Sequence, residues 1–313
     1  MAGDCIRQIP RWGFVLSLAA TILMMAAASA PSLFYPQIAE RLGLIPVATT
    51  LVFAVYTFTL LAALLYLGPL SDHVGRRPVV AAGSLALALS VAMFWFAGSL
   101  AALLVARALQ GLAAGLLIPA LSAMMIDFES PSHRNIAALW NTIGPMIGLG
   151  AGALGAALLL DLTSEPTTAV FGSLVLAFLI VATVVWSTPE LVPKTQIRRG
   201  DLRPRFTVPP HLRRMFTVGV PVIIAGWATN GLFLALGADL VGSELGGSTH
   251  TQAGIVLFAL AISGVTASSV LQRRSARTIS LYATSALAFG TAVSIGALAL
   301  GSYPAYVVSV AIV

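Results

Sequence analysis

The sequence predicts an all-α transmembrane protein, and two observations lead to this class. Hydrophobic residues make up 58% of the 313 residues and charged residues only 9%, whereas soluble domains carry about 25% charged residues. The apolar residues also form long stretches, each of the length that an α-helix needs to cross about 30 Å of hydrocarbon at about 1.5 Å per residue. A soluble enzyme is therefore excluded.

Nine such stretches follow one another, and eight of them contain no charged residue. They cover residues 12–35, 47–67, 79–98, 100–126, 136–160, 168–187, 215–237, 251–271 and 278–300. The start of a tenth follows Ser302-Tyr303-Pro304 and reaches Val313. The first stretch could be a signal peptide, since Ala28-Ser29-Ala30 looks cleavable, but it is too long and eight more follow, so we expect it to remain in the protein.

Basic residues are distributed over the loops in the pattern that orients membrane proteins. With the N-terminus inside, fifteen of the seventeen Lys and Arg residues fall in cytoplasmic segments, Arg41 lies outside and Arg107 lies within a span. Because cytoplasmic loops carry the excess of Lys and Arg, we expect a multi-pass protein of the plasma (inner) membrane with a cytoplasmic N-terminus. The spread of charge over short loops argues against a nucleic-acid partner, despite a net charge of +6.

The stretches fall into two groups around a basic linker. Residues 188–213 hold five prolines and six Lys or Arg residues, which is typical of a solvated connection rather than a helix. We therefore predict a six-helix transmembrane bundle over residues 1–187, a cytoplasmic linker over 188–213 and a second, partial bundle over 214–313.

The most specific motif is the charged turn between the second and third stretches. It reads Gly68-Pro-Leu-Ser-Asp72-His-Val-Gly75-Arg76-Arg77-Pro78. Its charges must lie at a membrane surface, and its two glycines permit a tight reversal. The motif resembles the signature loop between helices 2 and 3 of the major facilitator superfamily, written G-x-L-x-D-R-x-G-R-[RK], although His73 replaces the usual basic residue.

This resemblance implies two six-helix bundles, so we expect the second bundle here to be incomplete, without the rest of helix 10 and helices 11 and 12. In that family an acid at the inner end of helix 4 pairs with the signature loop. The resemblance thus implies a cytoplasmic latch, which consists of Gly68, Asp72, Gly75, Arg76, Arg77 and Asp127. The alternative is that Asp127 only marks the membrane edge.

The fourth stretch contains a charge at membrane depth. Its segment Leu103-Leu-Val-Ala-Arg107-Ala-Leu-Gln110-Gly111 is similar to the L-x-x-x-R-x-x-Q-G pattern of the family, and Arg107 and Gln110 share one helical face. Arg107 costs about 2.5–3.5 kcal/mol at such depth and should face a partner or a watery cavity. The resemblance implies a role in proton transfer; the alternative is an arginine that snorkels to the outer headgroups.

The fifth stretch contains a stripe of small residues around a proline, made of Gly144, Pro145, Gly148 and Gly152. It resembles the antiporter motif G-x-x-x-G-P-x-x-G-G in part, since Trp140 and Leu149 depart from it. We expect this stripe to pack against the similar one in the eighth stretch. Generic small-residue packing is the alternative. The sugar-porter signature P-E-S-P-R is absent after the sixth stretch, except for the first two letters at Pro189-Glu190.

The resemblance implies a secondary transporter of the drug:proton antiporter type, which exports small lipophilic compounds by alternating access. The polar and aromatic side chains expected at its substrate pathway, besides Arg107 and Gln110, are Tyr35, Tyr56, Asn141, Trp227 and Asn230. We expect a monomer in the lipid bilayer, with no cofactor, no metal site and no catalytic residues, driven by a proton gradient. Two alternatives stay open: a non-transporting truncated paralogue or scaffold, and a facilitator for another small metabolite.

Overall fold

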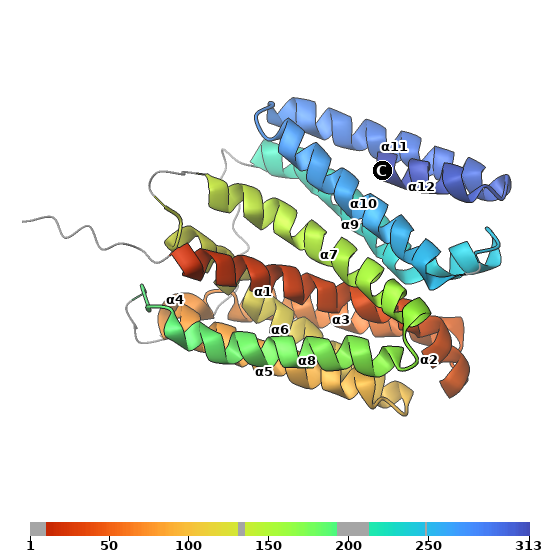
Figure 1. Ribbon diagram of the computed structural model, residues 1–313. Coiled ribbons are helices and arrows are strands. Elements are labelled where there is room, and N and C mark those ends of the chain that lie inside the picture. The colour runs from red at the N-terminus through yellow and green to blue at the C-terminus, as the bar shows by residue number, and fades with distance from the viewer. Residues whose placement is uncertain (1–10, 131–134, 193–212, 248) are drawn as a thin grey trace, which may run out of the picture.

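The computed structural model describes residues 11–130, 135–192, 213–247 and 249–313, and these residues form helices and connecting turns without any strand (Figure 1). The prediction of an all-α fold is confirmed. The N-terminal helices are α1 (Arg11–Ser29), η1 (Ala30–Phe34), α2 (Tyr35–Leu42), α3 (Pro46–Leu67), α4 (Leu70–Val74), α5 (Arg76–Trp95), α6 (Leu100–Asp127), α7 (Ile136–Leu162), α8 (Pro166–Val184) and η2 (Val185–Ser187). The C-terminal helices are α9 (Arg213–Ser243), α10 (His250–Leu271), α11 (Ala276–Ala299) and α12 (Tyr303–Ile312).

Within the described ranges, eight helical segments are long and apolar enough to cross a membrane. They are Trp12–Leu42, Val47–Leu67, Arg76–Trp95, Leu100–Asp127, Ile136–Leu162, Pro166–Ser187, His250–Leu271 and Arg277–Ala299. The stretch predicted at 215–237 lies inside α9, where the apolar part is the shorter segment Gly219–Phe233. The stretch that follows Pro304 forms the short helix α12. Most of the predicted linker, residues 193–212, lies outside the described residues.

The first span is not one continuous α-helix, as residues 12–35 predict, but is interrupted before its end. Residues Ala30–Phe34 form a 3₁₀ turn between α1 and α2. Pro31 and Pro36 cause this break, because each lacks the N–H that an α-helical hydrogen bond needs. The helix resumes as α2 and ends at Gly43, whose φ of 61° is the left-handed cap conformation.

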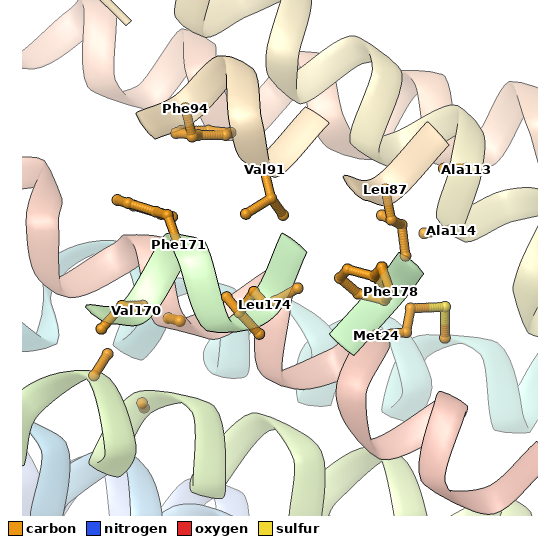
Figure 2. Packing of buried hydrophobic residues seen from close by; sticks show 14 of the residues in the cluster. Met24, Leu87, Val91, Phe94, Ala113, Ala114, Val170, Phe171, Leu174 and Phe178 are labelled. Carbon is orange, nitrogen blue, oxygen red and sulfur yellow. The ribbon is translucent and has the colours of Figure 1, made fainter. Parts of the chain in front are cut away.

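The core of the N-terminal bundle lies where α8 packs on α5, with α1 and α6 beside them (Figure 2). Leu87, Val91 and Phe94 follow one face of α5, because residues three or four apart lie above one another on a helix. Phe171 and Phe178 on α8 face them, and the rings of Phe94 and Phe171 stack with centroids 6.4 Å apart. Lipid chains are as apolar as these side chains, so close van der Waals contact holds the helices together.

Glycines set the closest approach between neighbouring helices. On α6, a Cβ at Gly115 would lie 2.9 Å from the carbonyl oxygen of Leu60 on α3. On α7, a Cβ at Gly152 would lie 2.5 Å from the Cα of Ala26 on α1. These two helix pairs therefore pack backbone against backbone, at distances that only glycine allows.

The small-residue stripe of α7 faces α1, so the prediction that it packs on the eighth stretch is wrong. Gly144 and Gly148 approach Leu18 and Met25 of α1. Helix α10 does pack along α7 (Figure 1). It does so on another face, where Gly150 meets Ala261. The stripe residues 144, 148 and 152 are spaced by four and share the face toward α1. Residues 146, 150, 154 and 157, which meet α10, lie on a different face of the same helix. Both faces carry small residues, so spacing alone does not distinguish them.

Candidate functional site

The central feature of the site is Arg107 on α6, which is buried inside the N-terminal bundle with 1% of its surface exposed. Its Nε donates to the hydroxyl oxygen of Tyr35 at 2.6 Å, and its Nη1 donates to Oε1 of Gln110 at 2.6 Å. Among the described residues no carboxylate lies within ion-pair distance of Arg107, and its Nη2 has no hydrogen-bond partner. The guanidinium is buried and bonded to buried side chains inside the bundle, so its geometry is not that of an arginine that snorkels to the headgroups.

Four aromatic rings surround the charge in place of an acid. The Cζ atom of Arg107 lies 5.0 to 5.5 Å from the ring centroids of Tyr35, Phe53, Tyr56 and Phe94. The negative face of an aromatic ring attracts a cation most strongly where water is excluded, by about 2 kcal/mol or more when the cation is desolvated. The rings come from α2, α3 and α5, so three separate helices converge on this one side chain.

The break in the first span orients the neighbour of Arg107. In an α-helix, the carbonyl of Ala27 would accept from the N–H of residue 31, but Pro31 has none. Instead, Gln110 donates its Nε2 to this carbonyl at 2.8 Å. Since the amide group is then fixed, its Oε1 faces Arg107 and accepts the bond described above.

Asn141 lies elsewhere, beside a cavity of about 80 Å³ between α1, α6 and α7. The cavity is lined by Thr21, Met24, Met25, Ile118, Ser122, Asn141 and Pro145. The Nδ2 of Asn141 donates to the Ser122 carbonyl at 3.4 Å. Ser122 follows Arg107 by fifteen residues on α6, or about 22 Å along a helix, so the structure does not bring Asn141 and Arg107 together.

The two candidate residues from the second bundle lie on α9. Trp227 is 64% exposed and contacts none of the groups around Arg107. Asn230 is in the same helix, but its side chain is outside the described part of the structure. Trp227 therefore does not contribute to the site around Arg107.

The residues of the cytoplasmic latch cluster at the other end of the bundle. Arg76 pairs with Asp72, donates its Nε to Asp127 Oδ2 at 3.1 Å, and donates Nη1 to Ser71 Oγ at 2.8 Å. Gly75 has a φ of 105°, which lets the chain turn between α4 and α5. Gly68 keeps right-handed angles, with φ of −49°, so only Gly75 needs a positive φ here; a Cβ at Gly68 would instead lie 2.5 Å from the carbonyl oxygen of Leu64.

A further member of this cluster, Glu190, is not among the residues that the motifs predict. Its Oε1 accepts from the backbone N–H of Arg76 and its Oε2 from that of Arg77, each at 3.1 Å. A carboxylate at a helix N-terminus satisfies free N–H groups and complements the helix dipole. A Cβ at Gly75 would lie 2.7 Å from Glu190 Oε2, so glycine is also needed for this approach. The signal in the sequence is the Pro189-Glu190 pair after the sixth stretch.

Comparison with known proteins agrees with this architecture. The family model described as Major Facilitator Superfamily matches residues 16–313. The puromycin resistance protein pur8 of Streptomyces alboniger is 32% identical over 46% of this chain and 29% of its own length. The multidrug efflux pump LfrA of Mycolicibacterium smegmatis is 31% identical over 69% of this chain and 41% of its own length. The matched segments thus span less than half of these relatives.

A solved structure supports the same fold. The crystal structure of a bacterial homologue of the human lysosomal transporter Spinster, in an inward-facing and unoccupied conformation, superposes with a TM-score of 0.73. It is 13% identical in sequence, and the alignment covers 99% of this chain and 73% of that one. Since the family model matches nearly the whole chain and belongs to transporters rather than enzymes, this multi-span membrane protein is a member of the Major Facilitator Superfamily.

Proposed function

We propose that the chain works as a secondary active transporter, which exports small lipophilic compounds by alternating access in exchange for protons. Two similar proteins are named for puromycin resistance and for multidrug efflux, which supports this substrate class. The transporter would act as a monomer in the plasma membrane, with a cytoplasmic N-terminus and without a cofactor. Its spans would number nine and the start of a tenth, with α9 as the seventh and α12 as the tenth.

The observation that carries the proposal is the buried cation of Arg107. A charged side chain at membrane depth is costly, and such residues mark ion or substrate pathways. Arg107 is held by a hydroxyl, an amide and four rings, while its Nη2 nitrogen has no protein partner among the described residues. This arrangement leaves the guanidinium free to bind a further acceptor or to respond to a proton nearby.

The cytoplasmic latch would supply the conformational part of the cycle. The ion pairs of Arg76 join α4, α5 and α6, and Glu190 joins α5 to the chain that follows α8. In this proposal the cluster favours one of the two access states, and its loss changes the equilibrium between them rather than the affinity for substrate. We also propose that the first bundle ends at residue 187 and that the second bundle begins at residue 214.

The test is transport by the purified protein in proteoliposomes, with ethidium as the probe and with or without an imposed pH gradient. We expect the gradient to accelerate ethidium movement. Arg107→Gln should lower the rate severalfold, and Arg107→Lys should restore it only in part, because an ammonium group cannot reproduce the planar fork that reaches both Tyr35 and Gln110. The matched control is Arg41→Gln, since Arg41 donates to the Ala97 carbonyl at 2.7 Å, away from the site.

Each result decides between the alternatives. Full activity of Arg107→Gln would remove this residue from the mechanism. A transport rate that does not depend on the pH gradient would favour a facilitator. A wild-type protein that inserts and folds but moves no probe would favour the scaffold.

A further inference from the structure

A carboxylate of the first bundle holds the first turn of a helix in the second bundle. Asp161 is near the end of α7, and His250 and Thr251 begin α10. Asp161 Oδ1 accepts from the His250 backbone N–H at 3.1 Å and lies 2.8 Å from the His250 Nδ1. Asp161 Oδ2 accepts from the Thr251 backbone N–H at 2.7 Å and from the Thr251 hydroxyl at 2.5 Å.

This carboxylate takes the place of the usual cap of α10. Thr249 occupies the N-cap position, yet its side chain makes no capping hydrogen bond. A helix begins with unpaired N–H groups, and a negative charge close to them is favourable. The first turn of α10 therefore receives its cap from a different bundle.

Asp161 is unfavourable for the helix that carries it. It lies in the last turn of α7, where the partial negative charge of the helix repels a carboxylate. Its bonds to α10 compensate this repulsion only while the two helix ends are together. Because the favourable contacts described for Asp161 are with α10, this carboxylate is suited to a contact between the bundles that forms and breaks.

The two helices also lie unusually close below this point. A Cβ at Gly254 on α10 would be 2.5 Å from the Cβ of Ala157, and a Cβ at Gly150 on α7 would be 2.6 Å from the Cβ of Ala261. Small residues on both helices permit this close approach. The polar contacts of Asp161 lie at one end of the interface, so a tilt that separates the two bundles at this end breaks them first.

We propose that Asp161, His250 and Thr251 form an outer clamp that holds the two bundles closed at the outer face. The inference rests on the proposed alternating access only in that the clamp must open in each cycle. Its strength then sets how much of the protein is open to the outside. The clamp is separate from the cytoplasmic latch, whose described contacts lie at the other end of the first bundle.

The test is a distance measurement by double electron–electron resonance on the whole chain in nanodiscs. Spin labels go on Leu162, at the end of α7, and on Glu244, directly after α9, both of them exposed. The only cysteine, Cys5, is replaced by serine. Asp161→Ala should raise the ratio of long to short distances about tenfold or more, since hydrogen bonds to an ionised group are the strong ones.

Two further variants make the measurement specific. Thr251→Val removes one bond to Asp161 and should shift the ratio in the same direction by a smaller factor. Glu165→Gln is the matched control, because Glu165 is a nearby exposed acid at the start of α8 that makes no capping bond. It should leave the distances unchanged.

Unchanged distances in Asp161→Ala, or an equal shift in Glu165→Gln, would overturn the clamp. Ethidium transport by the unlabelled wild type separates this result from the proposed function. If wild type does not transport but the Asp161 variant still opens, the clamp stands and the proposed function fails. If wild type transports and the distances stay the same, the clamp fails alone.

Discussion

Replacing Gly148 by alanine tests whether α1 and α7 pack as closely as the structure shows. The new Cβ would lie 2.7 Å from the Cβ of Met25 and 3.0 Å from the Cα of Ile22. The second contact is with backbone, which cannot rotate away. Overpacking of this kind costs about 1–3 kcal/mol.

The same change at Gly155 is the matched control, because it lies on the same helix with no atom within 4 Å of the new methyl group. In the middle of a helix, alanine stabilises the helix by about 1 kcal/mol relative to glycine, and both variants gain this stabilisation. We therefore expect Gly155→Ala to be slightly more stable than wild type. Gly148→Ala should be less stable than Gly155→Ala by about 1–3 kcal/mol.

The assay is thermal unfolding of the purified protein in detergent, with the three proteins measured side by side. The melting temperature should fall in the order Gly155→Ala, wild type, Gly148→Ala, if the clash exceeds the gain in helix propensity. Equal melting temperatures for the two variants would show that α1 does not approach Gly148 as described, and the packing argument would be refuted.

Three other predictions follow from the site. Glu190→Gln should lower the melting temperature, because the start of α5 loses a charged cap worth about 1 kcal/mol. An unchanged melting temperature would show that Glu190 does not act as this cap. Pro31→Ala supplies an N–H that competes with Gln110 for the Ala27 carbonyl. The variant should therefore fold but transport severalfold more slowly, and a wild-type transport rate would contradict this prediction. Single cysteines at Thr163 and Ser275 should react with membrane-impermeant reagents from outside and from the cytoplasm respectively, and labelling of both from one side would overturn the topology.

The candidate site was predictable where its residues are neighbours in a motif, or where the family resemblance names a distant partner, as it does for Asp127 with Arg76. Arg107 and Gln110 are three residues apart on one helix, so their contact follows from spacing alone. Asp72 and Arg76 are likewise neighbours on one turn. Glu190 joins Arg76 from 114 residues away, and no local pattern predicts which acid of a loop reaches a given helix end.

Composition and the lengths of the apolar segments are enough to predict the class of protein, because the bilayer selects for both. Segments of sufficient apolar length must be helical in lipid, where every backbone group needs an internal partner, and charges must fall at the surfaces. Which helix faces meet is visible only in the folded bundle. Gly144, Gly148 and Gly152 form a stripe suited to any neighbouring helix, and only the packed bundle shows that α1 covers it while α10 uses another face. The folded bundle also determines the surroundings of Arg107, since the rings and the Tyr35 hydroxyl converge from segments that are distant in sequence. Lipid does not distinguish one apolar helix face from another, so the choice depends on side-chain shape in three dimensions.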